Sequence, residues 1–112
     1  MAHGEGALNA SVVAVGLVQS GGVAGLGMTA TLRLADLPAA DADRARGLAE
    51  QVLTEPEPEA PQARTAVYDG LEYELTVTRA GAPDHQIHIR DGALTPAQRA
   101  LIGELRPHLH PF

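Results

Sequence analysis

The sequence predicts an α+β fold in which a four-stranded antiparallel sheet packs against two helices, in the order ββαββα. Two pairs of short segments have the apolar or alternating pattern of β-strands, and a turn containing glycine or proline joins the members of each pair. Each pair is followed by a segment whose apolar residues have the spacing of an amphipathic helix. Each hairpin therefore has an apolar face, which the helices are available to cover. A length of 112 residues suits one such domain.

The first predicted hairpin joins residues 11–18, a valine-rich run, to residues 28–34, where apolar and polar residues alternate. The connection carries four glycines between residues 19 and 27, and glycine reaches the positive φ that tight turns need. Glycine-rich loops that bind nucleotides lead into a helix, whose N-terminal amides hold the phosphates. Because this loop leads into a strand, a nucleotide site is excluded.

A helix is predicted over residues 35–53, with Pro38 in its first turn and with Asp41 and Asp43 near the positive end of its dipole. Its predicted buried face consists of Ala42, Ala45, Leu48, Ala49 and Val52. Residues 54–64 follow with three prolines and three glutamates, a composition that favours an extended, exposed loop. This acidic loop is either a solvated connector or a negatively charged arm that contacts a partner.

The second hairpin is predicted from residues 71–79 and 85–90, which are joined by a turn at residues 80–84. Apolar side chains at alternate positions predict one buried face, made of Tyr73, Leu75, Val77, Ile87 and Ile89. The residues between them are polar, so this hairpin is expected to have one apolar and one solvent-facing surface.

The last helix has a strong start signal at Thr95-Pro96-Ala97-Gln98, where threonine can cap, proline occupies the first turn and glutamine completes a capping box. Its predicted buried stripe consists of Ala97, Leu101, Ile102 and Leu105. Pro107 ends the helix. We therefore expect one domain over residues 11–106, a disordered segment over residues 1–10 and a C-terminal tail over residues 107–112.

The composition excludes several classes of function. The net charge is −6, all eight basic residues are arginine, and the chain has no lysine and no cysteine. The lack of lysine excludes Schiff-base chemistry and a Walker-type phosphate site, and an acidic chain without a basic stripe is not expected to bind nucleic acid. The chain has no signal peptide and no apolar run of about 20 residues, so we expect a cytoplasmic protein that does not enter a membrane.

The histidines do not form a metal-binding pattern. His85 and His88 would share a face on a helix, but on a strand they point to opposite faces. His108 and His110 lie in the predicted tail, where two ligands would make only an adventitious site. We therefore expect no metal ion and no other cofactor.

Catalytic residues are not expected either. Ser20 lies beside two glycines, but it lacks the G-x-S-x-G pattern at a strand-to-helix turn that defines a nucleophile elbow. Glu72 and Glu74 share the outer face of a predicted strand, where carboxylates commonly serve solubility and protect an edge. No apolar cleft that would shift the pKa of a general acid or base is indicated. The chain is thus not expected to be an enzyme or to have a small-molecule substrate.

The glycine-rich loop is the remaining candidate functional segment. Val23 and Leu26 are apolar side chains on a segment that should be exposed. One interpretation is structural, in which one or both side chains tuck under the hairpin and complete the core. In the other, the loop projects an aliphatic anchor while its glycines let the backbone approach another protein closely.

The segment Ser20-Gly21-Gly22-Val23-Ala24-Gly25 resembles a segment of the emfourin family, in which SGG is followed by an aromatic or aliphatic residue and then by AG. Emfourins are small bacterial proteins that inhibit thermolysin-like (M4) zinc metallopeptidases. The likeness extends over residues 12–106 and includes the helix start at Leu37-Pro38, the strands of the second hairpin and the last helix. Position 23 holds valine where the family favours a larger, often aromatic residue, and this difference bears on the identity of the target.

The resemblance implies an inhibitor that binds a bacterial M4 metallopeptidase and blocks its active-site cleft with the loop over residues 20–27. The partner-binding residues that it implies are Ser20, Gly21, Gly22, Val23, Gly25 and Leu26. The alternative is a small non-catalytic protein-interaction or scaffold domain that uses the exposed sheet face or an edge strand. A concentration-dependent dimer with no effect on proteases would favour that alternative.

Overall fold

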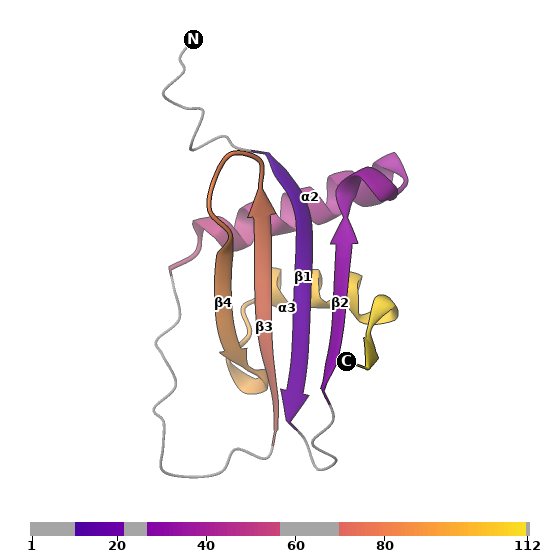
Figure 1. Cartoon of the computed structure of the whole chain (residues 1–112). Helices are drawn as coiled ribbons and strands as arrows, with labels where there is room; N and C mark the ends of the chain where they lie inside the picture. The colour runs from indigo at the N-terminus through magenta and orange to yellow at the C-terminus, as the bar shows by residue number, and fades with distance from the viewer. Residues whose placement is uncertain (1–10, 22–26, 57–69, 112) are drawn as a thin grey trace.

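A computed structural model describes residues 11–21, 27–56 and 70–111 of the chain (Figure 1). Its main elements are β1 (Val12–Gly21), β2 (Met28–Arg33), α2 (Ala39–Thr54), β3 (Leu71–Arg79), β4 (His85–Arg90), α3 (Pro96–Leu105) and β5 (His110–Pro111). Three short 3-10 turns connect them, namely η1 (Leu34–Asp36), η2 (Asp91–Ala93) and η3 (Arg106–His108). Both described helices lie on the same face of the sheet (Figure 1). Neither of them has the length and apolar character needed to span a membrane.

The strands form one five-stranded sheet in the order β4-β3-β1-β2-β5, and every neighbouring pair is antiparallel. The prediction of an α+β fold with an antiparallel sheet and two helices is therefore confirmed, but the prediction of four strands in the order ββαββα was wrong. The additional strand, β5, lies in the predicted tail and pairs with the start of β2. It has two residues, one of them a proline, so it carries no alternation from which a strand could be predicted, and its proline is tolerated because β5 is an edge strand.

The strands β3 and β4 have the boundaries that the alternation predicts, whereas β1 is longer than predicted. It continues past Val18 because it pairs with β3 as far as Gly21, which lies opposite Leu71. Pairing with a neighbouring strand thus extends β1 through residues that have low strand propensity. As a result, two residues of the predicted loop belong to the central strand of the sheet.

The helix α2 begins at Ala39, four residues after its predicted start at residue 35. The intervening residues form η1 and then an extended residue, Leu37, with φ −102° and ψ 153°. Leu37 is extended because the ring of the following proline disfavours the α conformation of the residue before it. Pro38 consequently occupies the N-cap position instead of the first turn.

The hydrophobic core lies between the sheet and the two helices. The sheet contributes alternate residues of its four long strands, mainly Val15, Leu17, Ala30, Leu32, Tyr73, Leu75, Val77, Ile87 and Ile89. The helices contribute Ala42, Ala45, Ala49, Val52, Leu101, Ile102 and Leu105. Two residues predicted to be buried, Leu48 and Ala97, are only partly buried against this core. Alternation and helical spacing therefore predict the core well except at the margin between the helices.

Polar contacts join the two helices at both ends of their interface. The amide of Gln98 donates to Thr95 Oγ1 at 3.1 Å and the amide of Thr95 donates to Gln98 Oε1 at 2.9 Å, which confirms the predicted capping box. The hydroxyl of Thr95 donates in turn to Glu55 Oε1 at the end of α2, at 2.9 Å. At the other end, Arg44 Nε lies 3.0 Å from Glu104 Oε2, and this hydrogen bond raises the pKa of Arg44 above its ordinary value.

Candidate functional site

The predicted functional loop starts and ends at one pole of the sheet. Figure 1 shows the end of β1 beside the start of β2 there, and Gln19 of β1 lies opposite Met28 of β2. We call this end of the sheet the loop pole and define it by Ser20, Gly21, Gly27 and Met28. Two of the predicted partner-binding residues, Ser20 and Gly21, are thus placed in β1. The others lie outside the described residues: Gly22, Val23, Gly25 and Leu26.

The position of Gly21 requires glycine for two reasons. Its φ is +93°, a conformation that residues with a side chain rarely adopt. A Cβ atom at this position would lie 2.7 Å from the carbonyl oxygen of Gly70, closer than real Cβ atoms approach. Gly70 directly precedes β3, so Gly21 permits the close approach of the end of β1 to the start of β3.

Ser20 is exposed on the open face of the sheet, the face opposite the helices. It lies opposite Glu72 of β3, which in turn lies opposite Arg90 of β4. The carboxylate of Glu72 is 3.5 Å from both Arg90 Nε and His88 Nε2. A polar row of serine, carboxylate and guanidinium therefore crosses three strands beside the loop pole. Sequence reasoning missed this row, because only the strand register brings Ser20 next to Glu72.

The middle of the open face has a shallow hollow of about 220 Å³. Its floor is made by small residues of β1, including Ala14, Gly16 and Val18, and threonines of β2 and β3 surround them. No charged side chain lines this hollow. It therefore offers no group for acid–base catalysis.

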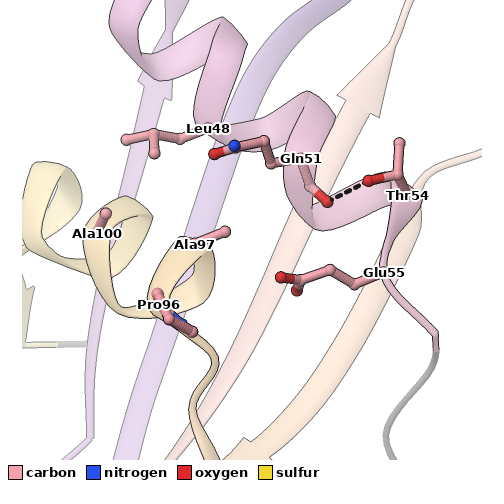
Figure 2. A pocket seen from close by; sticks show the side chains of 7 residues that line it. All are labelled: Leu48, Gln51, Thr54, Glu55, Pro96, Ala97 and Ala100. Carbon is pink, nitrogen blue, oxygen red and sulfur yellow. Dashed lines mark hydrogen bonds between the residues drawn. The ribbon is translucent and has the colours of Figure 1, made fainter.

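A larger hollow, of about 500 Å³, lies between the C-terminal part of α2 and the start of α3. It is lined by Leu48, Gln51, Thr54, Glu55, Pro96, Ala97 and Ala100. Figure 2 shows the carboxylate of Glu55 directed from the end of α2 toward the start of α3. Because Glu55 is the one titratable residue of this lining, the hollow lacks the pair of groups that general acid–base chemistry needs.

The histidines are arranged as strand geometry predicts. His85 is on the helix-facing side of β4, in alternation with the buried Ile87 and Ile89, and His88 is exposed on the open face. His110 lies in β5, where its Nδ1 is 3.2 Å from the carbonyl oxygen of Pro111. Within residues 11–21, 27–56 and 70–111, no group of three histidine, aspartate or glutamate residues could hold a metal ion.

The described residues thus form a small α+β protein, in which a five-stranded antiparallel sheet has both described helices on one face. A family model with the description Emfourin matches residues 17–106, and the chain belongs to the Emfourin family. The matched range contains the whole SGGVAG segment, the last five residues of β1 and all of the elements from β2 to α3. No curated protein and no solved structure matches the chain.

Membership of this family suggests that the chain is a metallopeptidase inhibitor with a protease as its partner. The matched range ends at residue 106, before β5.

Proposed function

We propose that this protein inhibits a bacterial thermolysin-like (M4) zinc metallopeptidase by covering its active-site cleft with the loop over residues 20–27. The observation that carries the proposal is the family match over residues 17–106, which contains this loop, the end of β1 and all of β2. The proposed partner-binding residues are Ser20, Gly21, Gly22, Val23, Gly25 and Leu26.

The strands at the loop pole hold the two ends of the proposed inhibitory loop. β1 pairs with β3 as far as Gly21 and with β2 as far as the pair of Gln19 and Met28. Both ends of the loop are therefore joined to strands that are held in place by their pairing within the sheet. A segment whose ends are already ordered loses less conformational entropy on association, which strengthens binding.

The side chains of the loop supply the contact in this proposal. Val23 and Leu26 present aliphatic groups, and burying such a group in an apolar pocket removes its surface from water. The glycines around them have no side chains, so the backbone can approach the walls of a cleft closely. The inhibitor then acts by occlusion, because a substrate cannot enter the cleft while the loop occupies it.

The experiment that tests the site compares two altered loops in one inhibition assay. In the first variant, serines replace Gly22-Val23-Ala24-Gly25, and we expect inhibition of a thermolysin-like peptidase to be lost. In the second, the acidic loop is shortened within residues 57–61, which keeps Glu55 and its hydrogen bond with Thr95, and we expect inhibition to be kept. Loss of inhibition in the second variant alone would assign the contact to the acidic loop and contradict the proposed site.

The second candidate function is a non-catalytic protein-interaction or scaffold domain. The hollow on the open face favours it, because this face is uncharged at its centre and no described helix covers it. Under this alternative, the protein would form a concentration-dependent dimer and would leave M4 peptidases active. Sedimentation velocity over a range of concentrations, alongside the inhibition assay, distinguishes the two functions.

A further inference from the structure

The C-terminal segment, residues 107–111, lies beyond the range that the family model matches and is nevertheless attached to the fold. Just before it, Arg106 Nη2 donates a hydrogen bond of 3.3 Å to the hydroxyl of the buried Tyr73. The amide of Leu109 donates to the carbonyl of Arg106 at 3.2 Å, and its side chain packs against the core. β5 then pairs with β2. These contacts hold the end of the chain at a defined place on the sheet.

That place is the loop pole. β5 pairs only with the first two residues of β2, with Met28 opposite Pro111 and Thr29 opposite His110. Within the described chain, the remaining residues of β2, 30–33, pair with β1 alone. Figure 1 shows the C-terminus beside the start of β2. The C-terminal segment thus adds a second pairing partner at the point where the chain returns from the loop.

We propose that the C-terminal segment positions the inhibitory loop by holding the start of β2. This inference rests on the proposed function, and it adds residues 107–111 to the residues on which binding of the peptidase depends. His110 and Pro111 act through the backbone of Met28 and Thr29, so they are positioning residues and not contact residues.

The physical reason is that strand ends fray. Without β5, Met28 and Thr29 would be the terminal residues of an edge strand, paired on one side only, and such residues open locally at low cost in free energy. If the start of β2 frayed, the loop that precedes it would have a wider range of positions available. The peptidase would then have to select one position from that range, which weakens apparent binding.

A deletion of residues 110–112 tests this inference in the otherwise complete chain. We expect the inhibition constant for a thermolysin-like peptidase to rise about tenfold, which corresponds to about 1.4 kcal/mol of binding free energy. Amide hydrogen exchange should accelerate at Met28 and Thr29 and stay unchanged at residues 31–33. The matched control deletes residues 1–10, which precede the opposite end of β1, and should leave both quantities unchanged.

A second variant separates positioning from direct contact. In the double substitution His110→Val and Pro111→Thr, the backbone of β5 can still pair with β2 while both side chains differ. We expect this variant to inhibit as the wild type does. If it weakens inhibition as much as the deletion does, the side chains contact the enzyme and the positioning role is wrong.

The remaining outcomes separate this inference from the proposed function. If the wild type inhibits and the deletion of residues 110–112 inhibits equally well, the C-terminal segment only covers a sheet edge, and the inference fails while the proposed function stands. If the wild type inhibits no M4 peptidase, the proposed function and this inference are both wrong.

Discussion

The two hairpins of this sheet use glycine for different reasons. In the hairpin of β3 and β4, Gly81 has φ +75°, and a Cβ atom there would have no neighbour within 4 Å. In the hairpin of β1 and β2, Gly21 has φ +93°, and a Cβ atom would lie 2.7 Å from the carbonyl oxygen of Gly70. Gly81 is therefore favoured by backbone conformation alone, whereas Gly21 is required by conformation and by close packing.

The two connections also differ in what stabilises them. In the turn between β3 and β4, Arg79 Nη2 donates to the carbonyl of Pro83 at 3.2 Å, and the amide of Ala82 donates to the carbonyl of Arg79 at 3.4 Å. These bonds lie within the hairpin itself. At the loop pole, the described residues also pair with strands outside the hairpin, β1 with β3 and β2 with β5.

The largest effect on inhibition is expected from the apolar residues of the loop. If Val23 or Leu26 is the anchor, its substitution by serine should raise the inhibition constant by about 30-fold or more, because anchors of this kind contribute about 2 kcal/mol. The melting temperature should stay unchanged. A fall in melting temperature with unchanged inhibition would assign that side chain to the core.

The next largest effect is expected from Gly21→Ala. The methyl group meets the Gly70 carbonyl and the backbone must adopt a positive φ, so we expect a loss of about 2–3 kcal/mol in unfolding free energy. Inhibition should weaken as well, since the end of β1 must move. Urea denaturation gives the first quantity, and titration of the peptidase gives the second. A variant as stable as the wild type would show that β1 does not need glycine at this position.

The matched substitution Gly81→Ala is expected to have a smaller effect. Only the strain of a positive φ opposes it, so the loss of unfolding free energy should be about 1 kcal/mol. Because this turn lies at the opposite end of β3 from Leu71 and the loop pole, inhibition should not change. Equal losses of inhibition in the two glycine variants would remove the distinction between the hairpins.

The smallest effect is expected from Glu72→Gln. Its contacts with Arg90 and His88 are 3.5 Å long and partly exposed to solvent, so their loss should change the unfolding free energy by less than about 1 kcal/mol. If the polar row beside Ser20 takes part in binding, the association rate should fall and its dependence on salt should change. Stopped-flow measurements at low and high salt test this expectation.

The same comparison shows how far the sequence predicts the fold. The boundaries of β3 and β4 follow from a clean alternation, and the start of α3 follows from its capping box. The extension of β1 to Gly21 and the existence of β5 depend on pairing with distant strands. Local patterns carry no signal for such pairing, so these features could not be predicted from the residues themselves.

The candidate site was predicted less completely than the fold. The sequence singled out Ser20 and Gly21 as loop residues, and the structure places them at the end of the central strand. The carbonyl oxygen of Gly70 leaves no room for a side chain at position 21, and this close approach exists only because β3 pairs with β1. The roles of Gly22, Val23, Gly25 and Leu26 rest on the resemblance to emfourins and on the family match, and they stay a prediction.

Inhibition by this protein is tested by titrating a thermolysin-like peptidase with the purified protein, using a fluorogenic peptide as substrate and a serine protease as control. We expect a stoichiometric loss of metallopeptidase activity and no effect on the serine protease. Full activity of several M4 peptidases at a molar excess of the protein would contradict this expectation.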